Sequence, residues 1–424
     1  MENTGVNHAM ALSVPRLGAR LTALAASILL ATCGGDLGSG GAVSVPGNNV
    51  AAITVDGGPA AAVNGINAAY VSVTICQPGS STNCQVIDHV LLDTGSTGLR
   101  LLASVVNSAL ALPQELDTAS QPLFECLDFA DSYVWGSVRL ADVLIANGKA
   151  QNLPVQVIGD SAAPTAPDEC SRAQAASPLP PGDTVAALNA NGILGVGVFR
   201  EDCGTGCTAP PSAGDIYQYY VCATTCAGET LDPTLQVQNV VYHFATNNNG
   251  VVIELPSVGA GGMFGARGSL VLGIGTAGNN ALGSATVLAV DPATGFLATT
   301  YKGKTLANSY IDSASKGLYF DDTITTCDPA SVAGGLYCPG AAPLALSASL
   351  QGSNGGTAQV NFTLGDGLTL LQAQPTYSAF SDIGGPLGDA TAFDWGLPFF
   401  YGRNVYVAIE GRAAGSATGP YFAF

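Results

Sequence analysis

The chain has 424 residues, of which 47% are hydrophobic and only 10% are charged, with 13 Lys and Arg against 31 Asp and Glu and a formal net charge of −18. This acidic balance excludes a nucleic-acid partner, because phosphate binding needs clusters of basic side chains. The chain has only three histidines, which excludes a His-rich zinc site and leaves carboxylates as the abundant reactive groups. We therefore expect neither a metal nor a cofactor, and the length allows two or three domains.

The first segment, residues 1–33, has the pattern of a signal peptide. Arg16 and Arg20 precede an apolar stretch at residues 21–31, which is too short for the ~20 residues that cross a bilayer. Cys33 follows this stretch and precedes two glycines, so the segment resembles a bacterial lipobox, although Thr32 departs from the small residue usual before the Cys. The resemblance implies lipidation of Cys33.

This interpretation places the protein outside the cytoplasm, in the periplasm or on the outer membrane, and joined to the membrane through the lipid on Cys33. Plain secretion, to the medium or the cell surface, and an unprocessed, buried Cys33 are the alternatives. Residues 34–49 are rich in Gly, Ala, Ser and Val and predict a flexible tether between the anchor and the folded part.

Beyond residue 50, the sequence predicts an all-β protein. Short runs rich in Val, Ile, Leu and Tyr recur between Gly, Asn, Asp and Pro, and sustained helical patterning is scarce. The expected strands include residues 69–75, 86–92, 138–145, 153–158, 251–255, 269–272, 310–312 and 404–409.

Ten cysteines follow Cys33, an even number that predicts five disulfides in an oxidising compartment. Short loops suggest the pairs Cys76–Cys84 and Cys327–Cys338, which leaves Cys126–Cys170 as a remainder. Two C-x3-C segments, Cys203/Cys207 and Cys222/Cys226, pair either within each segment or between the two. Two such segments are also compatible with zinc, which is the alternative interpretation.

An internal repeat is the most informative feature of the sequence. Residues 90–99, VLLDTGSTGL, recur as residues 309–318, SYIDSASKGL. Each copy places an Asp, Asp93 or Asp312, at the end of an apolar strand and at the start of a small, hydroxyl-rich turn. The spacing is too long for a short-period solenoid and predicts two similar lobes, one carrying each Asp.

Two such aspartates facing each other across a cleft form a site that needs no metal and no histidine. Two carboxyl groups within a few Å share one proton, so one can activate a water while the other supports a developing oxyanion. We expect Thr94 and Ser313 to brace the two loops. Ser96 and Ser315 are placed to donate hydrogen bonds to the carboxylates. Gly95 allows close approach of the backbone.

The residues of this site resemble the signature of the pepsin-like aspartic peptidases. Residues 91–96, LLDTGS, match that signature fully, and residues 192–197, 268–273 and 395–409 are similar to other strands of the family. The resemblance implies a bilobal fold with an N-terminal lobe at residues 50–278 and a C-terminal lobe at residues 279–424. It also implies a flap over the cleft, within residues 129–136, with Tyr133 or Trp135 as its aromatic residue. The chain is similar as well to an uncharacterised group of bacterial exported proteins of this fold.

Three features depart from the family pattern. Ala314 replaces the Gly expected two residues after Asp312. Residues 395–398 match the second apolar-apolar-Gly strand of the family only in part. No Lys or Arg lies between Arg20 and Arg100, so the chain lacks the basic residues of a family prosegment there. Separately, Asp321 and Asp322 with nearby Asp328 are an alternative, weak calcium site.

The expected function is hydrolysis of peptides or unfolded proteins at acidic pH by a monomeric endopeptidase that uses Asp93 and Asp312. The first alternative is a catalytically weak or inactive envelope protein that binds peptide, glycan or a protein partner in the interlobe cleft. A purely structural envelope protein is the second alternative.

Overall fold

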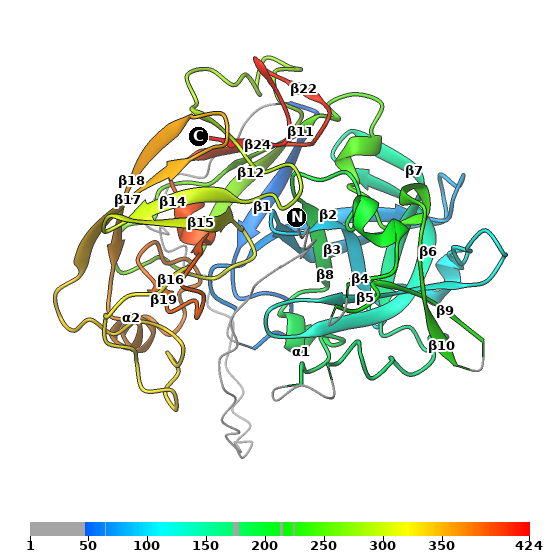
Figure 1. Ribbon diagram of the computed structural model, residues 1–424, viewed down its shortest axis with the longest axis horizontal. Coiled ribbons are helices and arrows are strands. Elements are labelled where there is room, and N and C mark those ends of the chain that lie inside the picture. The colour runs from blue at the N-terminus through cyan, green and yellow to red at the C-terminus, as the bar shows by residue number, and fades with distance from the viewer. Residues whose placement is uncertain (1–46, 64, 173–177, 213–214, 224) are drawn as a thin grey trace, which may run out of the picture.

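The computed structural model describes residues 47–63, 65–172, 178–212, 215–223 and 225–424 (Figure 1). The predicted signal peptide, Cys33 and most of the predicted tether lie outside these residues. The tether's last residue, Asn49, is buried, and its side-chain amide donates a hydrogen bond to the Leu272 carbonyl oxygen at 2.9 Å. The folded part therefore begins just before the predicted boundary at residue 50.

The described residues form mainly β-strands, which confirms the all-β prediction, and each of the eight strands expected from the sequence is present. Fifteen strands form a large sheet, whose order is β10 (Cys226–Glu229), β9 (Tyr219–Cys222), β5 (Leu123–Asp128), β6 (Tyr133–Ile145), β7 (Gly148–Ile158), β4 (Thr97–Leu102), β8 (Gly192–Val196), β3 (Cys84–Asp93), β2 (Ala69–Cys76), β1 (Val50–Val55), β12 (Ala266–Leu272), β11 (Gly250–Glu254), β21 (Asn404–Ala408), β24 (Tyr421–Ala423) and β13 (Val287–Ala289).

A smaller sheet has seven strands in the order β18 (Thr357–Leu364), β17 (Leu344–Gln351), β14 (Leu297–Tyr301), β15 (Lys304–Ile311), β20 (Phe393–Trp395), β16 (Leu318–Phe320) and β19 (Gly384–Gly385), and β22 (Ala413–Ala414) pairs with β23 (Ala417–Thr418). Helical segments are short: α1 (Val185–Leu188), α2 (Gly367–Ala373), η1 (Ser108–Leu110), η2 (Gly204–Thr208), η3 (Pro233–Leu235), η4 (Val241–His243) and η5 (Leu397–Phe400). None of the helices in the described ranges has the length and apolar character needed to cross a membrane.

In Figure 1 the smaller sheet lies on the left, strands β4 to β7 lie on the right, and β1, β11 and β12 lie between them. Three strands from beyond residue 278, β13, β21 and β24, belong to the large sheet. The chain after the predicted lobe boundary therefore contributes to both sheets.

The sequence repeat corresponds to a repeated arrangement of three strands. In the first copy, β8 lies parallel to β3 and antiparallel to β4, with Leu194 opposite both Leu92 and Leu99. In the second copy, β20 lies parallel to β15 and antiparallel to β16, with Trp395 opposite both Ile311 and Leu318. Each Asp therefore follows a strand that is hydrogen-bonded to a buried central strand.

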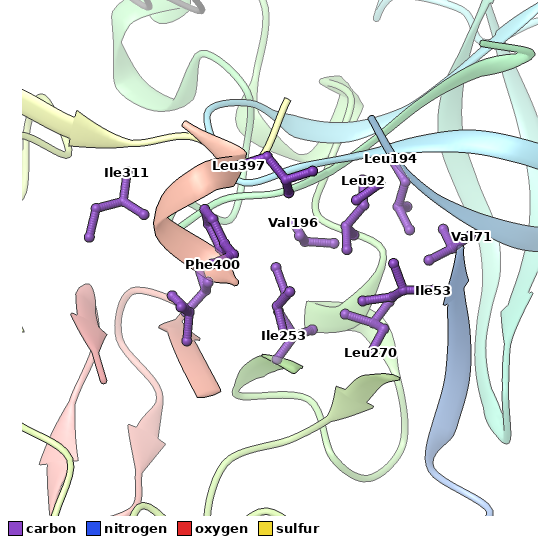
Figure 2. Packing of buried hydrophobic residues seen from close by; sticks show 14 of the residues in the cluster. Ile53, Val71, Leu92, Leu194, Val196, Ile253, Leu270, Ile311, Leu397 and Phe400 are labelled. Carbon is purple, nitrogen blue, oxygen red and sulfur yellow. The ribbon is translucent and has the colours of Figure 1, made fainter. Parts of the chain in front are cut away.

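The residues that precede the two aspartates are anchored in one hydrophobic core. Leu92 packs beside Leu194, and Ile311 lies toward Leu397 and Phe400 (Figure 2). All five side chains are fully buried or nearly so. Burial of such side chains contributes roughly 1.5–3 kcal/mol each, so the core holds both strand ends in place.

The five predicted disulfides are present: Cys76–Cys84, Cys126–Cys170, Cys203–Cys207, Cys222–Cys226 and Cys327–Cys338. Both C-x3-C segments pair locally. The zinc alternative was therefore wrong, because the four cysteines it required are joined to one another.

Candidate active site

The first of the two loops, the Asp93 loop, begins at Asp93, the last residue of β3. The Gly95 backbone N–H donates to Asp93 Oδ1 at 2.7 Å, and the Ser96 hydroxyl donates a short hydrogen bond to Asp93 Oδ2. The carboxyl group is almost completely buried. Both of its oxygens thus accept hydrogen bonds from the turn that follows.

The second loop, the Asp312 loop, repeats this arrangement at Asp312. The Ala314 backbone N–H donates to Asp312 Oδ1 at 2.9 Å, and the Ser315 hydroxyl donates to Asp312 Oδ2 at 2.9 Å. The residue in the place of the expected Gly therefore makes the same hydrogen bond as Gly95. Ala314 does not have the positive φ that would make a side chain costly at this position.

Four buried hydrogen bonds join the two loops. Each involves the side-chain hydroxyl of Thr94 or of Ser313 and a backbone group of the opposite loop. The Thr94 hydroxyl donates to the Ile311 carbonyl oxygen at 2.8 Å and accepts from the Ser313 N–H at 2.9 Å. The Ser313 hydroxyl donates to the Leu92 carbonyl oxygen at 2.6 Å and accepts from the Thr94 N–H at 3.1 Å. This is the reciprocal brace that the sequence predicted for this pair.

The brace brings the two carboxyl groups into contact. Asp312 forms a side-chain hydrogen bond with Asp93, and burial followed by the charge of Asp93 raises the pKa of Asp312 well above its usual range. Two carboxyl groups in such contact cannot both ionise at low cost, so the pair holds one proton over a wide pH range.

Gly95 is required by this contact. A Cβ atom placed on Gly95 would lie 2.8 Å from Asp312 Cγ and 3.0 Å from its Oδ1. The backbone of the first loop thus lies directly against the carboxyl group of the second, at a distance that no side chain at position 95 permits.

A largely apolar cavity lies against the turn that follows Asp93, although neither Asp93 nor Asp312 is among the described residues that line it. Its lining includes Gly95, Ser96, Leu127, Phe199, Phe296 and Tyr310. Leu127 lies near the end of β5, two residues before the predicted flap segment at residues 129–136. It could not be identified from the sequence, because alternation alone does not show which side of the hairpin faces the cavity.

The two predicted flap aromatics are among the residues that pack away from this cavity. Trp135 is buried against Phe124 and Tyr220, and its indole N–H donates to the Pro164 carbonyl oxygen at 2.8 Å. Tyr133 packs against the same cluster, and burial followed by the charge of Asp183 raises the pKa of its hydroxyl. Neither is among the residues that line the cavity in the described part of the chain.

A buried ionic cluster at the cavity's inner end also escaped the sequence analysis. The Arg100 guanidinium donates to Glu125 Oε1 at 2.6 Å and to Asp202 Oδ2 at 2.7 Å. Tyr219 also donates to Asp202, whose pKa is raised well above its usual range by burial and then by Glu125. Removing one member of such a cluster is strongly destabilising, because it leaves a buried charge without its partner.

The acidic residues of the alternative calcium site serve other contacts. Asp322 binds Lys302 at 2.7 Å and accepts from the Tyr301 hydroxyl, while Asp321 accepts from the Leu387 and Gly388 backbone N–H groups. Over the ranges that the structure describes, no group of three or more His, Cys, Asp or Glu side chains is arranged to hold a metal ion.

Comparison with known proteins gives a family and no activity. Residues 46–424 match the model of a family described as "Protein of unknown function (DUF3443)". No curated protein matches the chain. Because the family model covers all the described residues, including the Asp93 and Asp312 loops, the protein belongs to the DUF3443 family.

Proposed function

We propose that the chain is a bilobal, pepsin-like aspartic endopeptidase that hydrolyses peptides or unfolded proteins with a water activated by Asp93 and Asp312. The observation that carries the proposal is the hydrogen-bonded contact between these two buried carboxyl groups, each at the start of an equivalent loop. The repeated strand arrangement behind the loops supports two lobes of common design.

In this proposal Asp312 is the protonated member of the pair. Asp93 accepts two hydrogen bonds from its own turn and acts as the ionised general base that takes a proton from water. The hydroxide equivalent attacks the amide carbonyl carbon, and the proton on Asp312 supports the oxygen that becomes negative. The proton on Asp93 then passes to the leaving amine.

The cavity supports a substrate with an apolar side chain next to the scissile bond. Phe199, Phe296 and Leu127 line it together with Gly95 and Ser96, which belong to the turn that follows Asp93. Burial of one apolar side chain there contributes roughly 1.5–3 kcal/mol to binding.

The cellular location belongs to the same proposal. Five disulfides favour an oxidising, exported environment, and the predicted lipid on Cys33 would hold the enzyme at the membrane. There, peptides and unfolded exported proteins are the substrates we expect, and the enzyme acts as a monomer without a cofactor.

The test is cleavage of an unfolded protein by the mature chain between pH 3 and pH 7, with and without a statine-type transition-state mimic. Asp93→Asn and Asp312→Asn should each abolish turnover, whereas Asp168→Asn, a change at an exposed carboxyl on a surface loop, should leave it intact. Turnover that survives in either dyad variant would exclude the mechanism. Saturable peptide binding without turnover by the folded wild-type protein would instead favour the binding-protein alternative.

A further inference from the structure

Asn67, two residues before β2, connects the part of the chain that carries Asp93 to the second half of the molecule. The residue is completely buried. The strand that it enters, β2, pairs with β3 and places Tyr70 opposite Leu91, two residues before Asp93. Asn67 is therefore only one strand pairing away from the first aspartate.

Every hydrogen-bonding group of the Asn67 side chain is used. Its Nδ2 donates to the Lys316 carbonyl oxygen at 2.7 Å and to the Phe380 carbonyl oxygen at 2.8 Å. Its Oδ1 accepts from the Phe380 N–H at 2.8 Å and from the Tyr401 hydroxyl at 2.9 Å. The Asn67 backbone N–H adds a bond to the Ser378 carbonyl oxygen at 2.7 Å. An amide has two donor hydrogens and two acceptor sites, so this set is complete.

One of these partners lies at the end of the Asp312 turn. Lys316 directly follows Ser315, whose hydroxyl donates to Asp312 Oδ2 at 2.9 Å. Near its start, the same turn is held by the brace between Thr94 and Ser313. The turn is thus fastened to the first half of the chain at two points, by the brace and by the amide of Asn67.

The place of the Asn67 amide is itself fixed. Its backbone has a φ of 46°, in the left-handed region, which Asn tolerates better than most residues. The segment at residues 378–380, to which it binds, is also paired with Met263, whose N–H donates to the Ala379 carbonyl oxygen at 2.8 Å. The amide therefore joins parts of the two halves that are each held by further contacts.

We propose that Asn67 is a positioning residue for the Asp93/Asp312 pair, which fixes the end of the Asp312 turn against the half of the chain that carries Asp93. The interaction between two carboxyl groups depends on their separation, so a displaced turn changes how tightly the pair shares one proton. This inference deepens the proposed peptidase function and rests on it only where turnover is concerned.

The first test does not use activity. In the full mature chain with ¹³C-labelled Asp carboxyl groups, the titration of the pair gives two apparent pKa values. Asn67→Gly removes the amide but still allows the left-handed backbone. It should bring the two pKa values closer together, because carboxyl groups in looser contact interact less. A separation equal to that of the wild type in folded Asn67→Gly protein would overturn the proposal.

Asn249→Gly is the matched control. Asn249 is also buried, and its amide donates to the Ile274 carbonyl oxygen at 2.9 Å and to the Ala413 carbonyl oxygen at 2.8 Å. None of these residues belongs to the Asp93 or the Asp312 loop. The control should lower the unfolding midpoint, because it also removes a buried amide, but it should leave the titration of the pair unchanged.

Tyr401→Phe is a milder change at the same place. It removes one of the four side-chain hydrogen bonds of Asn67 and leaves the backbone of residue 67 unaltered. The two pKa values should move in the same direction as in Asn67→Gly, but by less. In the Asn67→Gly background, Tyr401→Phe should have no further effect on the titration, and an additive effect would contradict action through Asn67.

The second test uses turnover. Asn67→Gly should lower kcat on the order of 100-fold, the loss expected for a displacement of about 1 Å at reacting groups. KM should change little, because Asn67 is not among the described residues that line the cavity. Asn249→Gly should leave kcat unchanged. A raised KM with the kcat of the wild type would contradict a role in positioning the pair.

The outcomes separate the two levels of the argument. If the wild-type protein cleaves no substrate, the peptidase proposal fails, while the titrations still decide the role of Asn67. If Asn67→Gly does not fold, the titration of Tyr401→Phe decides it. Closer pKa values in Asn249→Gly, to the extent seen in Asn67→Gly, would indicate a general loosening of the fold and overturn the specific role.

Discussion

The Asp93 loop and the Asp312 loop make matching hydrogen bonds with different residues. Gly95 and Ala314 donate equivalent backbone hydrogen bonds to their aspartates, and Thr94 and Ser313 exchange equivalent bonds across the interface. Only Gly95 lies so close to the opposite carboxyl that a methyl group is excluded. The two loops share a hydrogen-bond pattern, but the steric demands on them are unequal.

The strands behind the loops differ as well. The first loop rests on an apolar strand, whereas the second rests on a strand that carries the buried Asp394. The two aspartates therefore lie in different surroundings, although they occupy matching positions in the repeat. The proposed division into one base and one acid requires such a difference.

The largest effect in this comparison is expected from Gly95→Ala. The added Cβ must displace the Asp312 carboxyl or the first loop, and a shift of about 1 Å at reacting groups costs on the order of 100-fold in rate. Turnover of an unfolded substrate by protein shown to be folded would measure it. Wild-type turnover in this variant would mean that the two loops do not approach as described.

The next largest effect is expected from substitutions in the brace between Thr94 and Ser313. Thr94→Val and Ser313→Ala each remove one hydroxyl and leave buried backbone groups without partners, which should lower the free energy of unfolding by about 1–3 kcal/mol. Denaturant titration of the two single variants and the double variant would measure this. Because the residues share one network, the double variant should lose less than the sum of the two, and strict additivity would argue against a reciprocal brace.

The coupled carboxyls also predict a pH dependence of stability. Because the pKa of Asp312 is higher in the folded state than in the unfolded chain, its contribution is fully present below its unfolded pKa and is lost as the pH rises toward the folded value. Asp312→Asn should therefore be more stable than wild type at pH 7 and gain little at pH 3. Unfolding midpoints at the two pH values, with Asp168→Asn as a control, provide the measurement, and an equal gain at both would contradict the assignment.

The smallest effect is expected from Ala314→Gly, the change that makes the second loop match the first. The backbone hydrogen bond to Asp312 already forms with Ala314, so turnover should change by less than about threefold, and stability should fall by about 0.4–1 kcal/mol because Gly has more freedom in the unfolded chain. A large gain in turnover would show that Ala314 holds the site in a weakened form.

Much of this site could be predicted because its residues are adjacent in sequence. The strand ends, the hydroxyls of the brace and the two aspartates all lie within the two copies of one short pattern, and the repeat itself indicates that they meet. The apolar-apolar-Gly stretch at residues 192–197 could be placed behind the first loop through resemblance. The second such strand was obscured because Asp394 interrupts its apolar pattern.

Other features depend on information that the sequence does not carry locally. Tyr133 and Trp135 lie on one face of β6 and Val134 lies on the other, as strand alternation predicts. Which face meets the cavity depends on the Cys126–Cys170 disulfide, whose cysteines pack in the same cluster as the two aromatic residues. Strict alternation would put His89 on the same face as Asp93, four residues later, but His89 has a φ of 47° at an irregularity in the pairing of β2 with β3, so alternation fails there.

The membership of β21 and β24 in the large sheet has a consequence for biogenesis. Strand β11 pairs with β12, its neighbour in sequence, on one side and with β21 on the other, so the sheet that carries Asp93 is completed only by segments near the end of the chain. A chain that becomes available from its N-terminus onward would expose the unpaired edge of β11 until residues 404–408 arrive. Completion of the sheet that carries Asp93 thus depends on nearly the entire polypeptide.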